Sequence, residues 1–292
     1  MLSIHTNTAA LSAQRAMGWA QQMLSTSMTR LSTGFRINSA MDDAAGLQIA
    51  TRLSAQTSGM AVAMRNTQNS TSLLQTAEGA FGEVTTMLVR MKDLATQAAD
   101  ASSNQKDRDA MQGEYDALGA ELYNVMTNTR YGGTLLLGNG SAGQGTLSQA
   151  MMFQIGASSS ETMQFSVAGD MGALNTALQA ISINFAPGTS AGSEFTSNSS
   201  SNGMIDLLAA AIDKVGGVRS ALGATANRLE HVHNNLANMV TNTKAAIGRI
   251  MDVDYAAESA NMTSAQMLLQ ASTAMLKQSQ SMQKMILSLL QP

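Results

Sequence analysis

Apolar residues recur at every seventh position near both ends of the chain. The rows are Ala10, Met17, Leu24 and Leu31 within residues 8–33, and Leu268, Met275, Met282 and Leu289 within residues 257–291. A seven-residue repeat keeps apolar side chains on one side of an α-helix, as in a coiled coil. The C-terminal stretch is expected to be one continuous helix, about 50 Å long at 1.5 Å per residue. The apolar row of this helix must be shielded from water by another element, and the N-terminal helix is the expected partner.

Three stretches in the middle of the chain carry the same period. Helices are predicted over residues 44–100, 105–128 and 204–250. The clearest apolar rows are Leu74, Phe81, Leu88 and Ala95, and Leu208, Val215, Leu222, Leu229 and Leu236. Ser39 is expected to cap the first of these helices, with Asp42 as its capping-box partner. That helix would be about 85 Å long, which exceeds the width of a compact domain of this size.

The pattern changes between residues 132 and 203, where the chain contains no Lys or Arg. Short apolar runs alternate there with turn-forming residues, which is typical of β-hairpins. Strands are predicted over residues 134–137, 151–155, 163–167 and 181–185, with a short helix over 171–178. Residues 188–202 are rich in Ser, Thr and Gly and are expected to form an exposed loop.

The order of these elements is palindromic and suggests five segments. Their bounds are 1–43, 44–131, 132–203, 204–251 and 252–292. We predict a mainly α fold, a long coiled-coil-like helical rod or bundle with a small β-hairpin region. The terminal helices pair as a coiled coil, and the three middle helices form a bundle.

Composition excludes several classes of function. The chain has 23 Met but no Cys, which rules out disulfides, zinc–thiolate sites and a thiol nucleophile. The net charge is −3 and there is no basic block, so nucleic-acid binding has no electrostatic basis. No apolar run is long enough to predict a membrane span. The N-terminus lacks a basic stretch followed by an apolar one, so we expect no cleaved signal peptide.

Two motifs could suggest chemistry, and neither fits its context. Glu230-His-Val-His233 carries two His that lie two residues apart, about 200° apart around a helix, so they cannot share one ion. Gly138–Gly143 matches G-x-G-x-x-G, but no helix is predicted to begin inside it. We therefore predict no catalytic, metal-binding or cofactor-binding residues, and a protein that is not an enzyme.

Three parts of the chain resemble the bacterial flagellins. Arg30–Ala50 reads RLSTGFRINSAMDDAAGLQIA, Arg249–Tyr255 reads RIMDVDY, and Ala265–Ala271 reads AQMLLQA, followed by the ending Leu287-Ser-Leu-Leu290. The first is similar to the family's signature where its two core domains join, and the others to its C-terminal half. The resemblance covers about residues 1–137 and 204–291. With its opening Met1–Asn7 and its short middle region, the chain is most similar to the lateral or otherwise short flagellins.

The resemblance implies a structural subunit that polymerises into the extracellular flagellar filament for motility. It implies that residues 1–43 and 252–292 form an inner core domain, and that 44–131 and 204–251 form an outer one. The eight residues of the two terminal rows would pack in the filament core. Implied partners are other copies of the chain, an export chaperone on the C-terminal helix, the type III export apparatus, and the filament cap and junction proteins. The hook–filament junction protein remains the alternative, because it shares the terminal signatures.

The resemblance also implies a patch that Toll-like receptor five of vertebrates could recognise. The matching positions are Arg90, Leu94 and Glu114. The flanking residues Val89, Lys92 and Asp93 depart from the commonest form of the motif. Packing is the alternative role for Leu94, because it adjoins Ala95 of the apolar row.

Overall fold

The computed structural model describes residues 7–138, 145–186 and 190–290, except for the side chains of 283 and 286–290. It divides into two compact units. The terminal unit comprises the described residues up to 57 and from 241 onward, and the central unit comprises those within 58–240. Helix α2 (Ala44–Ala99) and helix α5 (Asn198–Met251) each contribute to both units.

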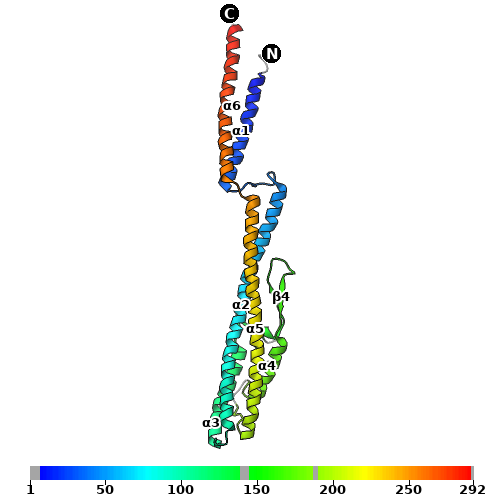
Figure 1. Cartoon of the computed structure of the whole chain (residues 1–292), viewed down its shortest axis with the longest axis vertical. Helices are drawn as coiled ribbons and strands as arrows, with labels where there is room; N and C mark the ends of the chain where they lie inside the picture. The colour runs from blue at the N-terminus through cyan, green and yellow to red at the C-terminus, as the bar shows by residue number, and fades with distance from the viewer. Residues whose placement is uncertain (1–6, 139–144, 187–189, 291–292) are drawn as a thin grey trace. The chain divides into compact units, whose positions relative to one another are not determined.

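The terminal unit is built on two helices that lie side by side, α1 (Thr8–Thr33) and α6 (Tyr255–Leu290) (Figure 1). Asn7 caps α1, because its side chain accepts a hydrogen bond from the Ala10 amide. Gly34 ends the helix in the left-handed conformation, at φ 77°, which a residue with a Cβ rarely adopts. The predicted pairing of the terminal helices is confirmed.

Short backbone contacts join the chain next to these two helices. Phe35 forms an antiparallel bridge with Asp252, and the Arg36 amide donates to the Met251 carbonyl at 2.6 Å. The Val253 amide donates to the Gly34 carbonyl at 3.0 Å. The segments that follow α1 and precede α6 are therefore tied together at the base of the pair.

The cap of α2 differs from the prediction. Asp43 caps this helix, because its Oδ1 accepts from the Gly46 amide at 2.8 Å. The Asp42 carboxylate instead accepts from the amides of Asn38 and Ser39 and closes a tight turn before the helix. These backbone hydrogen bonds lower the pKa of Asp42. Ser39 is occupied in this turn, so it does not act as the helix cap.

The central unit gathers one large hydrophobic core from α2, α3 (Gln105–Asn128), α4 (Ala168–Ile181) and α5. The predicted rows Leu74–Ala95 and Leu208–Leu229 are buried in it, so their seven-residue period identified the packing faces correctly. Two antiparallel hairpins complete the unit. They are β1 (Arg130–Tyr131) with β2 (Thr134–Leu135), and β3 (Met151–Gln154) with β4 (Thr162–Phe165). A 3₁₀ turn, η1 (Thr146–Ser148), lies between them in sequence.

Two local predictions in this region are wrong. Residues 181–185 do not form a strand, because Ile181 ends α4 and continues its buried row, with Met171, Leu174 and Leu178 at helical spacing. Residues 198–202 are not loop but the start of α5. The Ser197 hydroxyl accepts from the Ser200 amide, and this cap starts the helix earlier than the apolar pattern indicates.

Tyr115 provides a test of the central core. Its hydroxyl donates to the Ile181 carbonyl at 2.6 Å, and burial raises the pKa of the phenol above its ordinary value. We expect Tyr115→Phe to lower the free energy of unfolding by about 1 kcal/mol at neutral pH. Above pH ~10 the unfolded phenol loses its proton while the folded one keeps it, so this group lowers stability as pH rises. Denaturant unfolding at pH 8 and 10.5 should therefore show that the parent chain loses more unfolding free energy at the higher pH than Tyr115→Phe does. Equal losses in the two chains would contradict this expectation.

Candidate functional site

The seam between α1 and α6 is lined by small and polar residues. Ala20 and Ser27 are the buried residues of α1. Among the described side chains of α6, the buried ones are Glu258, Ala265, Ser272 and Ser279, which lie seven residues apart. Small side chains at every layer let two helix backbones approach closely, but they bury little apolar surface.

Hydrogen bonds at two levels set the register of this antiparallel pair. The Ser27 hydroxyl donates to Glu258 Oε1 at 2.5 Å, and Arg30 Nη1 lies 3.7 Å from Glu258 Oε2. Toward the other end of the pair, Asn7 Nδ2 donates to Ser279 Oγ at 2.8 Å. A slip of one turn would leave a buried carboxylate without these partners, so the polar contacts favour one register.

We expect Glu258→Ala to destabilise the α1–α6 pair by about 1–3 kcal/mol, because the Ser27 hydroxyl and Arg30 lose their acceptor inside the seam. Hydrogen exchange of the α1 and α6 amides measures the effect and should become faster. The control is Glu78→Ala, which removes an exposed carboxylate 3.9 Å from Arg219 and should leave these amides unchanged. Unchanged exchange in Glu258→Ala would show that the seam contact contributes nothing.

The C-terminal apolar row does not lie on this seam. Leu268, Met275 and Met282 are 45%, 65% and 49% exposed. Leu269 and Leu276, one residue farther along, are half-buried instead. The expectation that α1 covers the row is therefore wrong, because a seven-residue period also runs through Ala265 and Ser272, and that row fits the close approach. We call Leu268, Met275 and Met282 the outer row. The Leu289 side chain lies outside the described residues.

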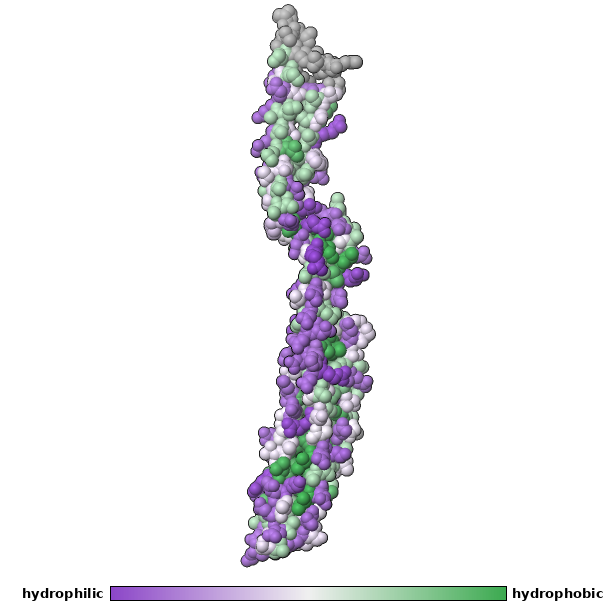
Figure 2. Space-filling view, viewed as in Figure 1, coloured by the Kyte–Doolittle hydropathy of each residue, from purple (hydrophilic) through white to green (hydrophobic). Residues whose placement is uncertain are grey.

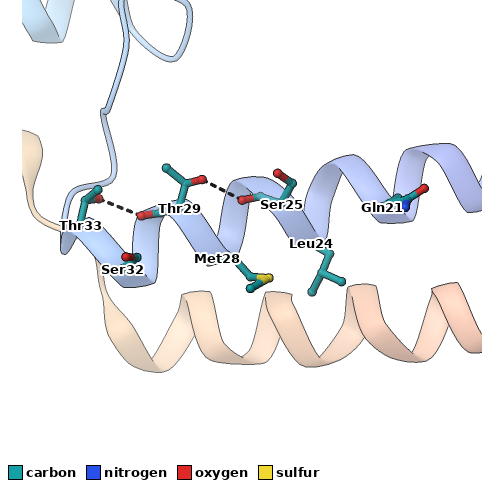
Figure 3. A pocket seen from close by; sticks show the side chains of 7 residues that line it. All are labelled: Gln21, Leu24, Ser25, Met28, Thr29, Ser32 and Thr33. Carbon is teal, nitrogen blue, oxygen red and sulfur yellow. Dashed lines mark hydrogen bonds between the residues drawn. The ribbon is translucent and has the colours of Figure 1, made fainter.

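The N-terminal row lies along the edge of the seam. Ala10, Met17, Leu24 and Leu31 are half-buried, and Figure 3 shows Leu24 pointing toward α6. On the other side of α1 the hydroxyls of Thr29 and Thr33 donate to carbonyls of their own helix. Trp19 and Met28 are exposed. Hydrophobic residues follow the length of the helix pair on the face seen in Figure 2.

The three residues of the expected receptor patch do not share one surface. Arg90 Nε and Nη2 donate to the Glu114 carboxylate at 2.7 and 3.0 Å, and both side chains are exposed. The hydrogen bond from Arg90 lowers the pKa of Glu114. Leu94 is only 2% exposed and belongs to the central core. Its burial on the core face next to Ala95 favours the packing role, and receptor contact by Leu94 stays a prediction.

The described residues show no site for chemistry. They contain no group of three or more His, Asp or Glu placed to hold a metal ion. His233 Nδ1 instead lies 3.4 Å from the Thr67 hydroxyl. None of the helices in the described ranges has the length and apolarity that crossing a bilayer requires. Residues 139–143 of the glycine motif lie outside the described part of the chain.

Long heptad helices, with a polar seam inside and apolar rows outside, define a class of structural proteins that self-associate through helix packing. Comparisons with known proteins identify the family. The model of the bacterial flagellin N-terminal helical region matches residues 4–142, and that of the C-terminal helical region matches residues 205–290. This chain belongs to the bacterial flagellin family.

Relatives along the whole chain agree. It is 33% identical to Flagellin A of Vibrio anguillarum, over 99% of this chain and 100% of that protein. It is also 33% identical to Polar flagellin F of Vibrio parahaemolyticus, over 99% of each. A solved structure, provisionally assigned as a flagellar hook-associated protein of Vibrio parahaemolyticus, has a TM-score of 0.54 at 15% identity. It covers 72% of this chain and 100% of that one, and it shows a shared fold alone.

Family membership settles the general function. The chain is a structural subunit of the bacterial flagellar filament, which is extracellular, and it polymerises with its own copies. It is not an enzyme. Curated relatives of full length are flagellins, so the filament subunit is favoured over the junction protein.

Proposed function

We propose that the outer row of α6 is the surface by which one subunit packs against other copies in the core of the filament. The observation that carries this proposal is the exposure of Leu268, Met275 and Met282 at a seven-residue period on a helix whose other side already pairs with α1. A contiguous exposed apolar row is unfavourable in water and favours association. Ala10, Met17, Leu24 and Leu31 contribute from the edge of the seam. Residues 1–43 and 252–292 then form the inner part of the subunit, and residues 44–131 and 204–251 form the outer part, with 132–203 as its hairpin and loop region.

A cysteine-accessibility experiment tests this surface. The chain has no native Cys, so only the introduced thiol can be labelled. Met275→Cys should react with a maleimide in the monomer and become protected when the monomer elongates filament seeds. Ala265→Cys, on the seam, is the control and should be protected in both states. Equal labelling of Met275→Cys in monomer and filament would refute the proposed surface. Electron microscopy of sheared cell-surface protein, with subunit counting, separates filament subunit from junction protein.

We further propose that the same helix binds partners before and during assembly. An exposed apolar row needs cover in the cytoplasm, so an export chaperone on α6 fits the physical requirement. We also propose, by likeness to the flagellin family, export through the flagellar type III apparatus and addition beneath a filament cap next to junction proteins. A pull-down from cells tests chaperone binding. It compares the parent chain with a variant that carries Gln at the three positions of the outer row. Equal capture by both chains would argue against it.

Toll-like receptor five is the remaining candidate partner, and we propose Arg90 and Glu114 as its contacts without Leu94. The exposed two-bond ion pair between them supports this reduced patch. Arg90→Ala should weaken the response of receptor-reporter cells to purified monomer. Arg219→Ala, which removes another exposed partner of a carboxylate, should not. No response to the parent monomer at saturating dose would end the proposal.

A further inference from the structure

Four of the five methionines of α6 gather on the side that faces away from α1, and the fifth, Met262, is half-buried. Met267, Met275, Met282 and Met285 are between 49% and 65% exposed. The seam side carries Leu269 and Leu276 at the equivalent half-buried positions. Leu and Met are both good helix formers and similar in volume. Helix formation and apolarity alone therefore do not require thioethers on the exposed side.

A thioether differs from Leu in one respect that bears on assembly, because it can be oxidised. Hydrogen peroxide transfers one oxygen atom to the sulfur, which forms the sulfoxide and leaves water. The sulfur loses two electrons and the peroxide gains them. The product is polar and strongly hydrated, and methionine sulfoxide reductases can restore the thioether. Burying it against another subunit would leave an S=O group without a partner, which is unfavourable.

We propose that these four methionines form a reversible oxidation site that controls polymerisation. With thioethers the α6 surface is apolar and the subunit assembles. With sulfoxides it is polar and the subunit stays out of the filament. The inference rests on the proposed packing of the outer row between copies. The filament itself is protected, because the same sulfurs are buried once neighbours cover them.

The rest of the fold tolerates the same treatment. The core methionines Met60, Met91 and Met126 are at most 2% exposed, so peroxide reaches α6 long before it reaches them. Met28, Met41, Met152 and Met239 are exposed outside α6 and will also react. Oxidation of the monomer should therefore change its surface while the central unit remains folded.

The experiment treats purified monomer with dilute hydrogen peroxide, maps sulfoxides by peptide mass spectrometry, and measures elongation of filament seeds. We expect elongation to fall about tenfold or more as the α6 methionines oxidise, and to recover after treatment with both reductase types. In one variant Met267, Met275, Met282 and Met285 are replaced by Leu, and elongation should resist peroxide. In the matched variant the exposed methionines outside α6, Met28, Met41, Met152 and Met239, are replaced by Leu, and elongation should remain sensitive.

The outcomes separate this inference from the proposed surface. If oxidised parent chain elongates normally, or the α6 Leu variant loses elongation as the parent does, the oxidation site is refuted. If Met275→Cys stays reactive in filaments, the packing surface itself is wrong. If the α6 Leu variant does not elongate even without peroxide, the matched variant without exposed methionines outside α6 decides. If elongation by the oxidised matched variant recovers as its α6 sulfoxides are reduced, the oxidation site is supported. If elongation does not recover, the site is refuted.

Discussion

A chain that ends at residue 272 will form no filaments, although its central unit will fold normally. The deletion removes Met275 and Met282 of the outer row and the Ser279 partner of Asn7. The shortened α6 then lacks both the apolar surface proposed to contact other copies and one of the two contacts that set the seam register. The central core lies within residues 74–229 and loses nothing. Seeded elongation followed by electron microscopy measures the first effect, and far-UV circular dichroism with hydrogen exchange of residues 58–240 measures the second.

The matched control for this deletion is Ser279→Ala in the full-length chain. It removes one polar contact of the seam but leaves every apolar residue of α6 in place. We expect it to polymerise, at a slower rate if the pair frays near Asn7. Filaments of normal yield from the truncated chain would show that residues 273–292 are dispensable and that the subunits associate elsewhere.

The sequence was sufficient where one apolar row dominates. Leu74, Phe81 and Leu88 are large, regularly spaced and completely buried, so the period alone located the core face of α2. It was insufficient where several rows share the period. On α6 the large residues Leu268 and Met275 face outward, while Ala265 and Ser272, with a weaker apolar signal, form the seam. Only the partner helix distinguishes these rows, because close approach rewards small side chains more than large ones.

The same reasoning explains the burial of Leu94 and the error at Ser39. The residues around Leu94 resemble the receptor motif. Whether Leu94 itself is exposed depends on which side of α2 faces the core, and the local sequence does not determine this. Ser39 and Asp43 both precede α2 and both can cap a helix. The choice depends on Asp42, whose carboxylate binds the amides of Asn38 and Ser39 and so shapes the turn. Side-chain contacts of this kind come from three-dimensional packing and not from composition.

The two sides of α6 have different roles, one in folding of the helix pair and the other in assembly with other copies. The seam stabilises the pair through hydrogen bonds and close packing, and it sets one register. It buries little apolar surface, so the pair by itself gains only modest stability. The apolar side chains of the outer row lie on the outer surface, where they are covered only when other copies bind. A terminal pair built in this way gains most of its stability from polymerisation.

Replacing Leu268, Met275 and Met282 together by Gln should abolish polymerisation without unfolding the monomer. Gln is a good helix former, and none of the three positions lies on the seam, so α6 should still pair with α1. Each apolar side chain buried between copies contributes about 1.5–3 kcal/mol. Losing three should raise the monomer concentration needed for growth about a thousandfold or more. Sedimentation of seeded filaments gives that concentration, and hydrogen exchange of α1 reports the seam.

The conservative triple variant Leu268→Met, Met275→Leu and Met282→Leu is the matched control, because it keeps the row apolar and nearly equal in volume. It should polymerise like the parent chain. A Gln variant that polymerises equally well would place the subunit contacts on another surface. A Gln variant whose α1 amides exchange much faster would show that the outer row supports the helix pair itself. Loss of growth with an intact seam is the result that assigns assembly to the outer row and folding to the inner one.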